Sequence, residues 1–428
     1  MKLWEKGISI DKKIEKFTVG NDRELDMFIA KFDIIASKAH ARMLEKVGIL
    51  TQAELKEMIR ELDNLQAQVS AGTFRIGEEF EDVHSKIEYE LTNALGETGK
   101  KIHTARSRND QVLVAMQLYF KENLKEIIGQ TNNLIEVLLG LANEHREKVL
   151  PGYTHLQVAM PSSFGLWFSA YAELLIDDIY MLQAGLKVVD QNPLGSAAGY
   201  GSSFPIDREF TTKDLGFSTL KFNVVSAQMS RGKSERTITS VISSLANTLS
   251  RFAMDICLYM SQNFDFITFP DELTTGSSIM PHKKNPDVFE LIRGKSNKLQ
   301  AIANEIILIT NNLPSGYHRD FQLIKENSIY SVESIKEILD VFTHSIKLVE
   351  VKEVNLQDEK YKYLFTVDSI NDLVMKGSSF REAYVEIGKK VQDGTYEPGN
   401  SIKHTHTGSK DNLALEEIKR KMTEAGEK

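Results

Sequence analysis

Cysteine and long apolar runs are scarce in this sequence of 428 residues. Its single thiol, Cys257, cannot form an internal disulfide, so nothing points to an oxidising compartment. No apolar run is long enough to span a bilayer, and residues 1–13 mix Lys, Glu and Asp where a signal peptide would carry an apolar core. These absences predict a cytoplasmic protein without membrane contact. Cys257 lies in the apolar stretch Phe252–Tyr259 and is expected to be a buried small hydrophobe.

Excess positive charge is also missing. The net charge is −8 and the isoelectric point is near 5.8, with 41% hydrophobic and 26% charged residues. This balance is typical of a globular protein with a large core. It disfavours a general nucleic-acid binder, which needs a cationic surface. The net charge does not exclude a local basic site for an anionic metabolite.

Proline is sparse, and the first of nine prolines is Pro151. Because proline breaks helices and central strands, the proline-free spans leave room for long helices. These spans are 162–192, 206–269, 287–313 and 315–397.

Apolar residues recur at helical spacing in several segments. One series consists of Met116, Phe120, Leu124, Ile127, Leu134, Leu138 and Leu141. A single helix over 110–145 would be about 50 Å long. Residues 164–179 and 238–256 repeat the pattern, whereas alternating, strand-like segments are few and short. The sequence therefore predicts an all-α fold whose body is a bundle of long helices.

Some of these helices carry apolar residues on more than one face, as at Ile306–Leu308. Such a helix needs several neighbours, which favours an oligomer, although a thick monomeric core is an alternative. We predict an N-terminal helical domain over 1–105, a central bundle over 106–360 and a C-terminal helical cap over 361–428. The tail from residue 416 is highly charged and is expected to fray.

The least ordinary segment runs from Thr274 to Asp287, with the sequence Thr-Thr-Gly-Ser-Ser-Ile-Met-Pro-His-Lys-Lys-Asn-Pro-Asp. Gly276 and the two serines predict a polar loop. Asn285 and Pro286 read as an N-cap followed by the first helical residue. Lysines, hydroxyls and free N–H groups at a helix start suit carboxylate binding. A solvated loop before a helix is the alternative.

Residues 276–286 resemble the signature loop of the fumarase, aspartase and argininosuccinate lyase superfamily. Within it, the ending Lys-Lys-Asn-Pro-Asp is similar to the argininosuccinate lyase family. Further blocks carry the same resemblance over essentially the whole chain, at 81–84, 103–111, 151–157, 192–196, 313–322 and 380–383.

The chain departs from the family pattern at two places that bear on the site. Ala105 stands where the family usually has glycine, and we expect that glycine to be tolerated rather than required. The segment Phe17–Asp22 is shorter and lacks the family's N-terminal serine, so no site residue is carried over there.

The resemblance implies an all-helical homotetramer with a shared central bundle and active sites built from several subunits. It implies cofactor-free cleavage of argininosuccinate into arginine and fumarate, in arginine biosynthesis. Ser277 would be the base, and Lys283 and Asn285 would hold carboxylates against the charge of the intermediate. His155 would be the general acid, oriented by Glu290.

Other residues would bind the substrate if the resemblance holds. Tyr317, Gln322 and Lys325 would hold the arginine end, with Asp82 a weaker candidate. The succinyl carboxylates would contact Ser107, Arg108, Asn109 and Thr154. Taken singly, each has a structural alternative, such as packing for Tyr317.

Three other interpretations are possible. The chain could be another fumarate-releasing lyase, acting on adenylosuccinate, aspartate or malate, or a catalytically silent structural homologue. Residues 227–234 loosely match a phosphate-binding loop but contain one glycine only, which disfavours nucleotide binding. His103, His404 and His406 lack acidic or thiol partners at ligand spacing, so we expect no metal site.

Overall fold

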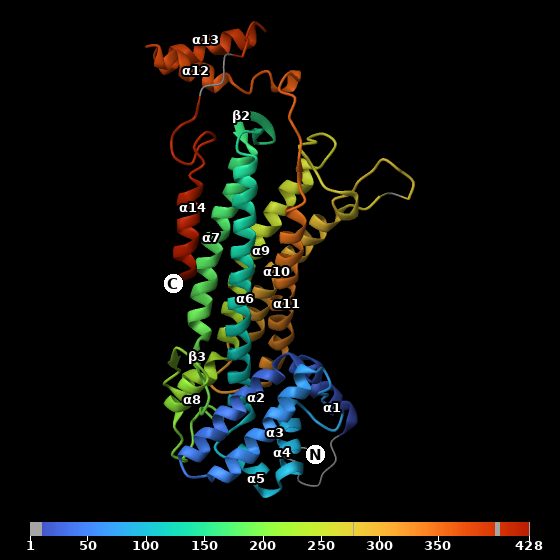
Figure 1. Cartoon of the computed structure of the whole chain (residues 1–428), viewed down its shortest axis with the longest axis vertical. Coiled ribbons are helices and arrows are strands. Elements are labelled where there is room, and N and C mark those ends of the chain that lie inside the picture. The colour runs from blue at the N-terminus through green and yellow to red at the C-terminus, as the bar shows by residue number, and fades with distance from the viewer. Residues whose placement is uncertain (1–10, 277, 399–402, 428) are drawn as a thin grey trace. The chain divides into compact units, whose positions relative to one another are not determined.

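The structure is a computed structural model, and it describes residues 11–276, 278–398 and 403–427. The described chain is helical, with three two-stranded sheets (Figure 1). The helices are α1 (Lys12–Val19), α2 (Asp22–Lys46), α3 (Gln52–Ser70), α4 (Val83–Leu95), α5 (Glu97–Lys100), α6 (Arg108–Glu144), α7 (Phe164–Val189), α8 (Arg208–Asp214), α9 (Val224–Tyr259), α10 (Asp287–Thr310), α11 (Leu323–Ile346), α12 (Thr366–Met375), α13 (Phe380–Gln392) and α14 (Leu415–Glu427). The strands are β1 (Val149–Thr154), β2 (Gln157–Ser163), β3 (Gln191–Asn192), β4 (Thr219–Leu220), β5 (Ile267–Thr268) and β6 (Glu350–Val351).

The prediction of an all-α, long-helix fold is confirmed. The single helix expected over 110–145 is α6, and α7, α9, α10 and α11 lie within the proline-free spans. In α3 and α13 the start of the helix is fixed by a capping box, Thr51 with Glu54 and Ser379 with Glu382. None of the described helices is long and apolar enough to cross a membrane.

The contacts divide the chain into two compact units. Unit 1 contains the described residues within Met1–Ile127, Met181–Ser244 and Lys298–Lys336. Unit 2 contains those within Ile128–Tyr180, Leu245–Asn297 and Glu337–Lys428. The boundaries fall inside α6, α7, α9, α10 and α11. The three consecutive regions expected from the sequence are a different partition and stay a prediction.

Each unit has its own core. In unit 1, α2 packs against α3 and α4, and these helices lie side by side in Figure 1. In unit 2 the rings of Tyr171 and Phe252 stack with centroids 4.0 Å apart, and Phe342 lies 4.9 Å from Phe252. The hydroxyl of Tyr171 donates to Asp255 over 2.7 Å, so its polar end is satisfied inside this apolar cluster.

The expectation that the tail frays is wrong. Residues 415–427 form α14, which lies beside α7 and buries Ile418, Met422 and Ala425 (Figure 1). These three recur at spacings of four and three, so they form one apolar face among the charges. Lys421 adds ion pairs to Glu173 and to Asp177 on α7.

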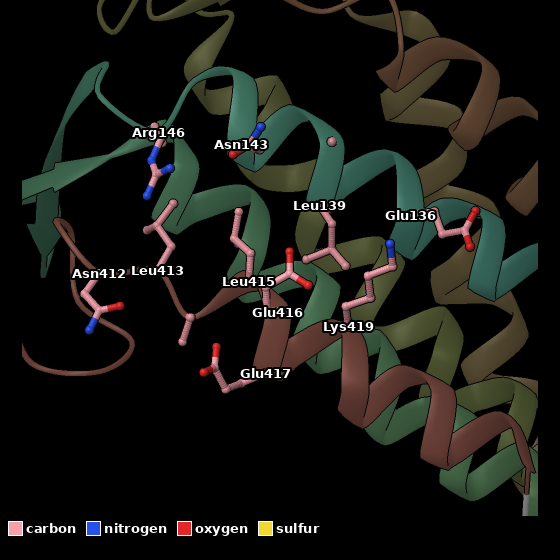
Figure 2. Close-up of a pocket in the computed structure, with 12 residues that line it drawn as sticks. Glu136, Leu139, Asn143, Arg146, Asn412, Leu413, Leu415, Glu416, Glu417 and Lys419 are labelled. Atoms are coloured by element: carbon pink, nitrogen blue, oxygen red, sulfur yellow. The ribbon is translucent and has the colours of Figure 1, made fainter.

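A cavity of about 690 Å³ lies within unit 2 beside the start of α14. Figure 2 shows it between residues of α6, including Asn143, and the segment that leads into α14. Arg146 and Glu416 contribute opposite charges to its wall. The residues that line it include none of the site residues expected from the sequence, so this cavity does not bear on the proposed chemistry.

Candidate functional site

The expected site residues fall into both units. In unit 1 a cavity of about 120 Å³ is lined by Asp22, Asp26, Glu81, Asp82, His84, Arg108, Asn109, Val112, Arg231, Tyr317, Arg319, Gln322 and Lys325. Six of the residues expected from the sequence therefore line one cavity. They come from segments more than two hundred positions apart in the chain.

The first turn of α6 is held in place by a buried carboxylate. Ser107 precedes the helix, and its hydroxyl accepts a hydrogen bond from the Asn109 N–H over 3.3 Å. Asp110 is fully buried and accepts from the N–H groups of Ser107, Gly195 and Ala197 at 2.9–3.0 Å. Burial raises the pKa of Asp110, against these hydrogen bonds. Asp110 thus fixes the turn that carries Ser107 and Asn109.

Ala105, just before this turn, has a φ of 61°. The expectation that glycine is merely tolerated there is wrong, because the backbone adopts the left-handed region that favours glycine. An L-residue in that region costs about 1–2 kcal/mol. The next residue, Arg106, is buried and bonded to Ser37 and Asp33 at 3.0 and 3.5 Å. This anchoring fixes the turn although alanine strains it.

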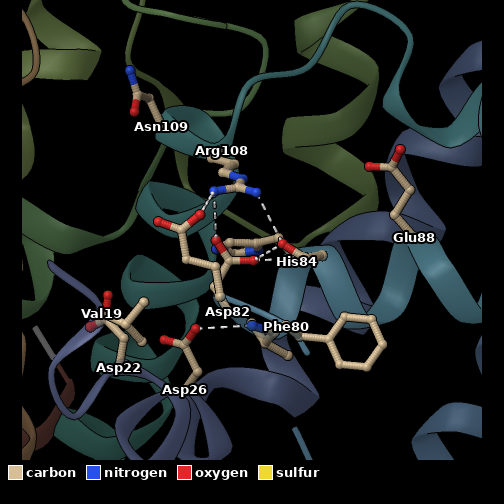
Figure 3. Close-up of polar contacts among 12 residues, drawn as sticks. Val19, Asp22, Asp26, Phe80, Asp82, His84, Glu88, Arg108 and Asn109 are labelled. Atoms are coloured by element: carbon tan, nitrogen blue, oxygen red, sulfur yellow. Dashed lines mark hydrogen bonds and ion pairs between the residues drawn. The ribbon is translucent and has the colours of Figure 1, made fainter. Parts of the chain in front are cut away.

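Arg108 is held by carboxylates of its own unit. Its Nη1 lies 2.8 Å from Glu81 and 3.4 Å from Asp82, and its Nη2 donates to the Ser85 hydroxyl over 3.1 Å (Figure 3). Burial alone would lower the pKa of Arg108, but Asp82 and Glu81 outweigh it and the pKa rises. A ligand carboxylate bound to Arg108 would therefore contact a guanidinium that already pairs with Glu81 and Asp82.

Lys325 is a buried cation of the cavity. Its ammonium lies 2.6 Å from Asp26 and 2.9 Å from Asp22, both on α2. The second oxygen of Asp26 accepts from the Val83 N–H over 3.0 Å. Burial alone would lower the pKa of Lys325, but the two aspartates reverse the effect and raise it. The lysine therefore stays charged at neutral pH.

The end of α1 holds two residues of the cavity wall, Gln322 and Arg319. Gln322 donates to the carbonyls of Thr18 and Val19 over 2.8 and 2.9 Å. Arg319 donates to Thr18 over 2.7 Å and pairs with Glu81 at 3.1 Å. The segment Phe17–Asp22, from which no residue was carried over, thus contributes the carbonyls of Thr18 and Val19 and also the carboxylate of Asp22, which pairs with Lys325.

Sequence reasoning missed several charged residues of this cavity, namely Asp22, Asp26, Glu81, His84, Arg231 and Arg319. Glu81, His84 and Arg319 lie within the motif blocks 81–84 and 313–322, and the four-residue spacing of Asp22 and Asp26 places that pair on one face of α2. Burial would lower the pKa of His84, but its contact with Asp33 at 2.9 Å raises it instead. The cavity thus combines cations and anions, as suits a zwitterionic ligand.

In unit 2, His155 occupies the tip of a strained hairpin. Strands β1 and β2 pair up to Thr154 and Gln157, which leaves a two-residue turn. His155 and Leu156 have φ values of 53° and 57°, the geometry of a type I′ turn that usually recruits Asn and Gly. Strain of this kind clusters at functional sites. Thr154 and His155 are both exposed, and the His155 ring has no hydrogen bond or ion pair within the described chain.

The signature loop lies at a second cavity, of about 730 Å³, which Lys283, Asn285 and Glu290 help to line. The two ends of the loop are joined by a hydrogen bond from the Asn285 N–H to the Thr275 carbonyl, over 2.9 Å. Lys283 is exposed, and its ammonium has no carboxylate partner among the residues that the structure describes. Ser277, the expected base, lies outside the described residues.

The start of α10 differs from the expectation by one residue. The Pro286 carbonyl accepts the first helical bond, from the Glu290 N–H over 3.0 Å, so Pro286 is the cap rather than the first helical residue. The Asn285 side chain instead donates to the Thr275 hydroxyl over 3.4 Å. Glu290 lies 3.8 Å from Arg293, and no described contact joins it to His155.

Cys257 lines the same cavity and is only partly buried, which corrects the expectation of a core residue. Burial raises the pKa of its thiol to about 11, so it stays protonated at neutral pH. A protonated thiol is a poor nucleophile. Among the described residues, no group of three or more His, Cys, Asp or Glu side chains could hold a metal ion.

Known proteins share both the sequence and the fold. A family model described as a lyase matches residues 6–301. An argininosuccinate lyase from Parabacteroides distasonis is 52% identical over 97% of this chain and 94% of its own. Another, from Thermotoga neapolitana, is 42% identical over 91% of this chain and 98% of its own.

Solved structures with this fold are much less similar in sequence. A variant of EDDS lyase with bound fumarate gives a TM-score of 0.75 at 20% identity, over 98% of this chain and 90% of its own. A class II fumarase from Schistosoma mansoni gives a TM-score of 0.71 at 17% identity, over 89% of this chain and 93% of its own. This chain shares its fold with both structures. Because the argininosuccinate lyases named above are 42–52% identical to it over more than nine tenths of its length, the chain belongs to the argininosuccinate lyase family.

Proposed function

We propose that this chain cleaves argininosuccinate into L-arginine and fumarate by a cofactor-free elimination. Its family membership over nearly the whole chain is the observation that carries the proposal. A base removes a proton from the carbon beside one succinyl carboxylate. The C–N bond then breaks, and the guanidino nitrogen leaves as arginine after it receives a proton. The cytoplasmic location and the absence of a cofactor stay predictions.

The intermediate carries surplus negative charge, because the carbanion spreads into the neighbouring carboxylate. Catalysis requires groups that bind this charge more strongly than they bind the substrate. Lys283 suits this task because its exposed ammonium has no carboxylate partner among the described residues. We assign Lys283 and Asn285 to the carboxylate at which this charge develops.

Ser277 is proposed as the base and His155 as the general acid, with Glu290 orienting the imidazole. A serine hydroxyl is a base only as an alkoxide, which a nearby ammonium such as that of Lys283 would stabilise. The hairpin presents His155 to solvent without a partner in the described chain. An imidazole held in this way is available to a site that another subunit completes.

The unit 1 cavity is proposed to bind the substrate. Tyr317, Gln322 and Lys325 hold the arginine end of the substrate. Asp82, a weaker candidate for the same end, lies 3.4 Å from Arg108. The succinyl carboxylates are assigned to the first turn of α6 and to the hairpin, through Ser107, Arg108, Asn109 and Thr154. The long helix α6 also offers N–H groups at its start, which favour an anion.

We also propose that the chain forms a homotetramer. The long helices expose large apolar side chains, and on α10 both Leu291 and Leu308 are 65% exposed. Exposed apolar side chains of this size favour a neighbouring subunit. Sedimentation equilibrium should give about four times the chain mass of 48.4 kDa. A mass of one chain at micromolar concentration would contradict the proposal.

A panel of four substrates tests the activity. With argininosuccinate, adenylosuccinate, aspartate and malate, we expect fumarate absorbance to rise for argininosuccinate with kcat/KM roughly 10³-fold or more above the others. The reason is that the other three substrates lack the arginine end and could not use the contacts assigned to Tyr317, Gln322 and Lys325. Preference for another substrate would move the chain to a different lyase activity. A folded tetramer that makes no fumarate from any of them would support the silent homologue.

A further inference from the structure

The long helix α9 contains a break that directs one side chain into the unit 1 cavity. Arg231 has φ −61° and ψ 129°, and Gly232 has φ 84° and ψ −40°, so neither is helical. Glycine is the residue that adopts such a φ without cost. A Cβ at position 232 would also lie 3.0 Å from the side chains of Phe321 and Thr310. The break is therefore set by this glycine and by its close neighbours.

Arg231 is buried at this break, with an exposed fraction of 4%. Its Nε lies 3.2 Å from Glu235, and its Nη2 donates to the Phe321 carbonyl over 3.1 Å. The other carboxylate oxygen of Glu235 accepts from the Gly232 N–H over 2.6 Å. Two sides of the guanidinium are thus fixed by protein groups.

The third side of the guanidinium has no hydrogen-bond partner from the described protein. The Nη1 of Arg231 is buried and has no hydrogen-bond partner in the described chain, and Arg231 lines the cavity. Buried donors are almost always satisfied in folded proteins. Lys325, in the same wall, is already bonded to two aspartates. Arg231 is therefore a buried cation of this wall with unused donors, on Nη1 and on Nε.

We propose that Arg231 is a substrate-binding residue, whose Nη1 donates to the α-carboxylate of the substrate's arginine end. This inference rests on the proposed function, which assigns that end to Tyr317, Gln322 and Lys325. Arg231 belongs to the same side because it bonds to Phe321, the neighbour of Gln322. The residue then selects substrates whose leaving group is an α-amino acid rather than a simple guanidine.

The competing explanation is structural: Arg231 could serve only to clamp the break in α9 through Glu235 and Phe321. The two roles differ in what they do to ligand discrimination. A clamp affects every ligand alike, whereas a carboxylate contact affects only ligands that have the carboxylate. L-arginine and agmatine differ by that group alone, so they separate the two roles.

The experiment measures the inhibition constants of L-arginine and agmatine against fumarate release. In the wild-type protein, L-arginine should inhibit at least about tenfold more strongly than agmatine. In Arg231→Met this ratio should fall by roughly tenfold, because a charge-assisted hydrogen bond is lost. A ratio that stays at the wild-type value in the folded variant would overturn the proposal and leave Arg231 as a clamp.

Two further variants keep the result interpretable. Arg231→Met leaves Glu235 buried without its ion-pair partner, so the double variant Arg231→Met/Glu235→Gln is measured where the single variant fails to fold. The matched control is Glu235→Gln alone, which removes the ion pair but keeps Arg231 and should retain the ratio. If Glu235→Gln alone also loses the preference for L-arginine over agmatine, Arg231 acts only as a structural clamp of the break in α9. A wild-type protein that makes no fumarate from argininosuccinate would refute the proposed function itself.

Discussion

Ser277→Ala should lower kcat for argininosuccinate cleavage by roughly 10³-fold or more, because it removes the only group assigned to proton abstraction. KM should change little, since the binding of the two ends is assigned to other residues. Fumarate absorbance under saturating substrate measures kcat directly. The helical circular dichroism and the sedimentation mass of the variant should match those of the wild type, which separates lost chemistry from lost structure.

A matched variant is available at the next position. Ser278→Ala removes the neighbouring hydroxyl of the same loop and should lower kcat far less, because a hydroxyl that only binds can be lost without losing the base. If Ser278→Ala is the more damaging of the two, the base has been assigned to the wrong serine. If Ser277→Ala retains more than about a tenth of wild-type kcat, proton abstraction does not depend on it.

Lys325→Met should have the largest effect on stability, a loss of about 3–5 kcal/mol, because it leaves buried carboxylates without their cation. Asp26 is fully buried, and Asp22 already has a pKa raised by burial. Chemical denaturation followed by circular dichroism measures the loss at pH 7. As the pH falls, Asp22, whose pKa is already raised, is protonated first, so the difference in unfolding free energy from wild type should narrow. Fumarate release should fall as well, since Lys325 is assigned to the arginine end.

The control for this prediction lies on the same helix. Lys336 is also on α11 and pairs with Glu126 at 3.0 Å, but its side chain is 19% exposed. Lys336→Met should cost about 1 kcal/mol or less, as for an ion pair open to solvent. Adding Asp22→Asn and Asp26→Asn to Lys325→Met should recover part of the lost stability. Equal losses in Lys325→Met and Lys336→Met would show that burial of the Lys325 cluster is unimportant.

The placement of the helices could be predicted from the sequence alone. The series from Met116 to Leu141 has a period that only a helix satisfies, and the absence of proline lets α6 continue over its full length. The motif blocks that contain Arg108 and Gln322 could also be found, since each block is contiguous in the chain. The tail was misjudged because its charge was weighed without the spacing of Ile418, Met422 and Ala425.

Which charges face one another was decided by the tertiary structure. Lys325 and Asp26 are 299 positions apart, and nothing in the local pattern of either helix pairs them. The same holds for the left-handed backbone at Ala105, which an anchored neighbour imposes, and for Arg231, which a break in α9 turns into the cavity. Periodicity and proline act within one helix, so the sequence by itself determined the helices and the motif blocks. Burial and ion pairing act between helices, so only folding determined which acids hold Arg108 and Lys325 and where strain is retained.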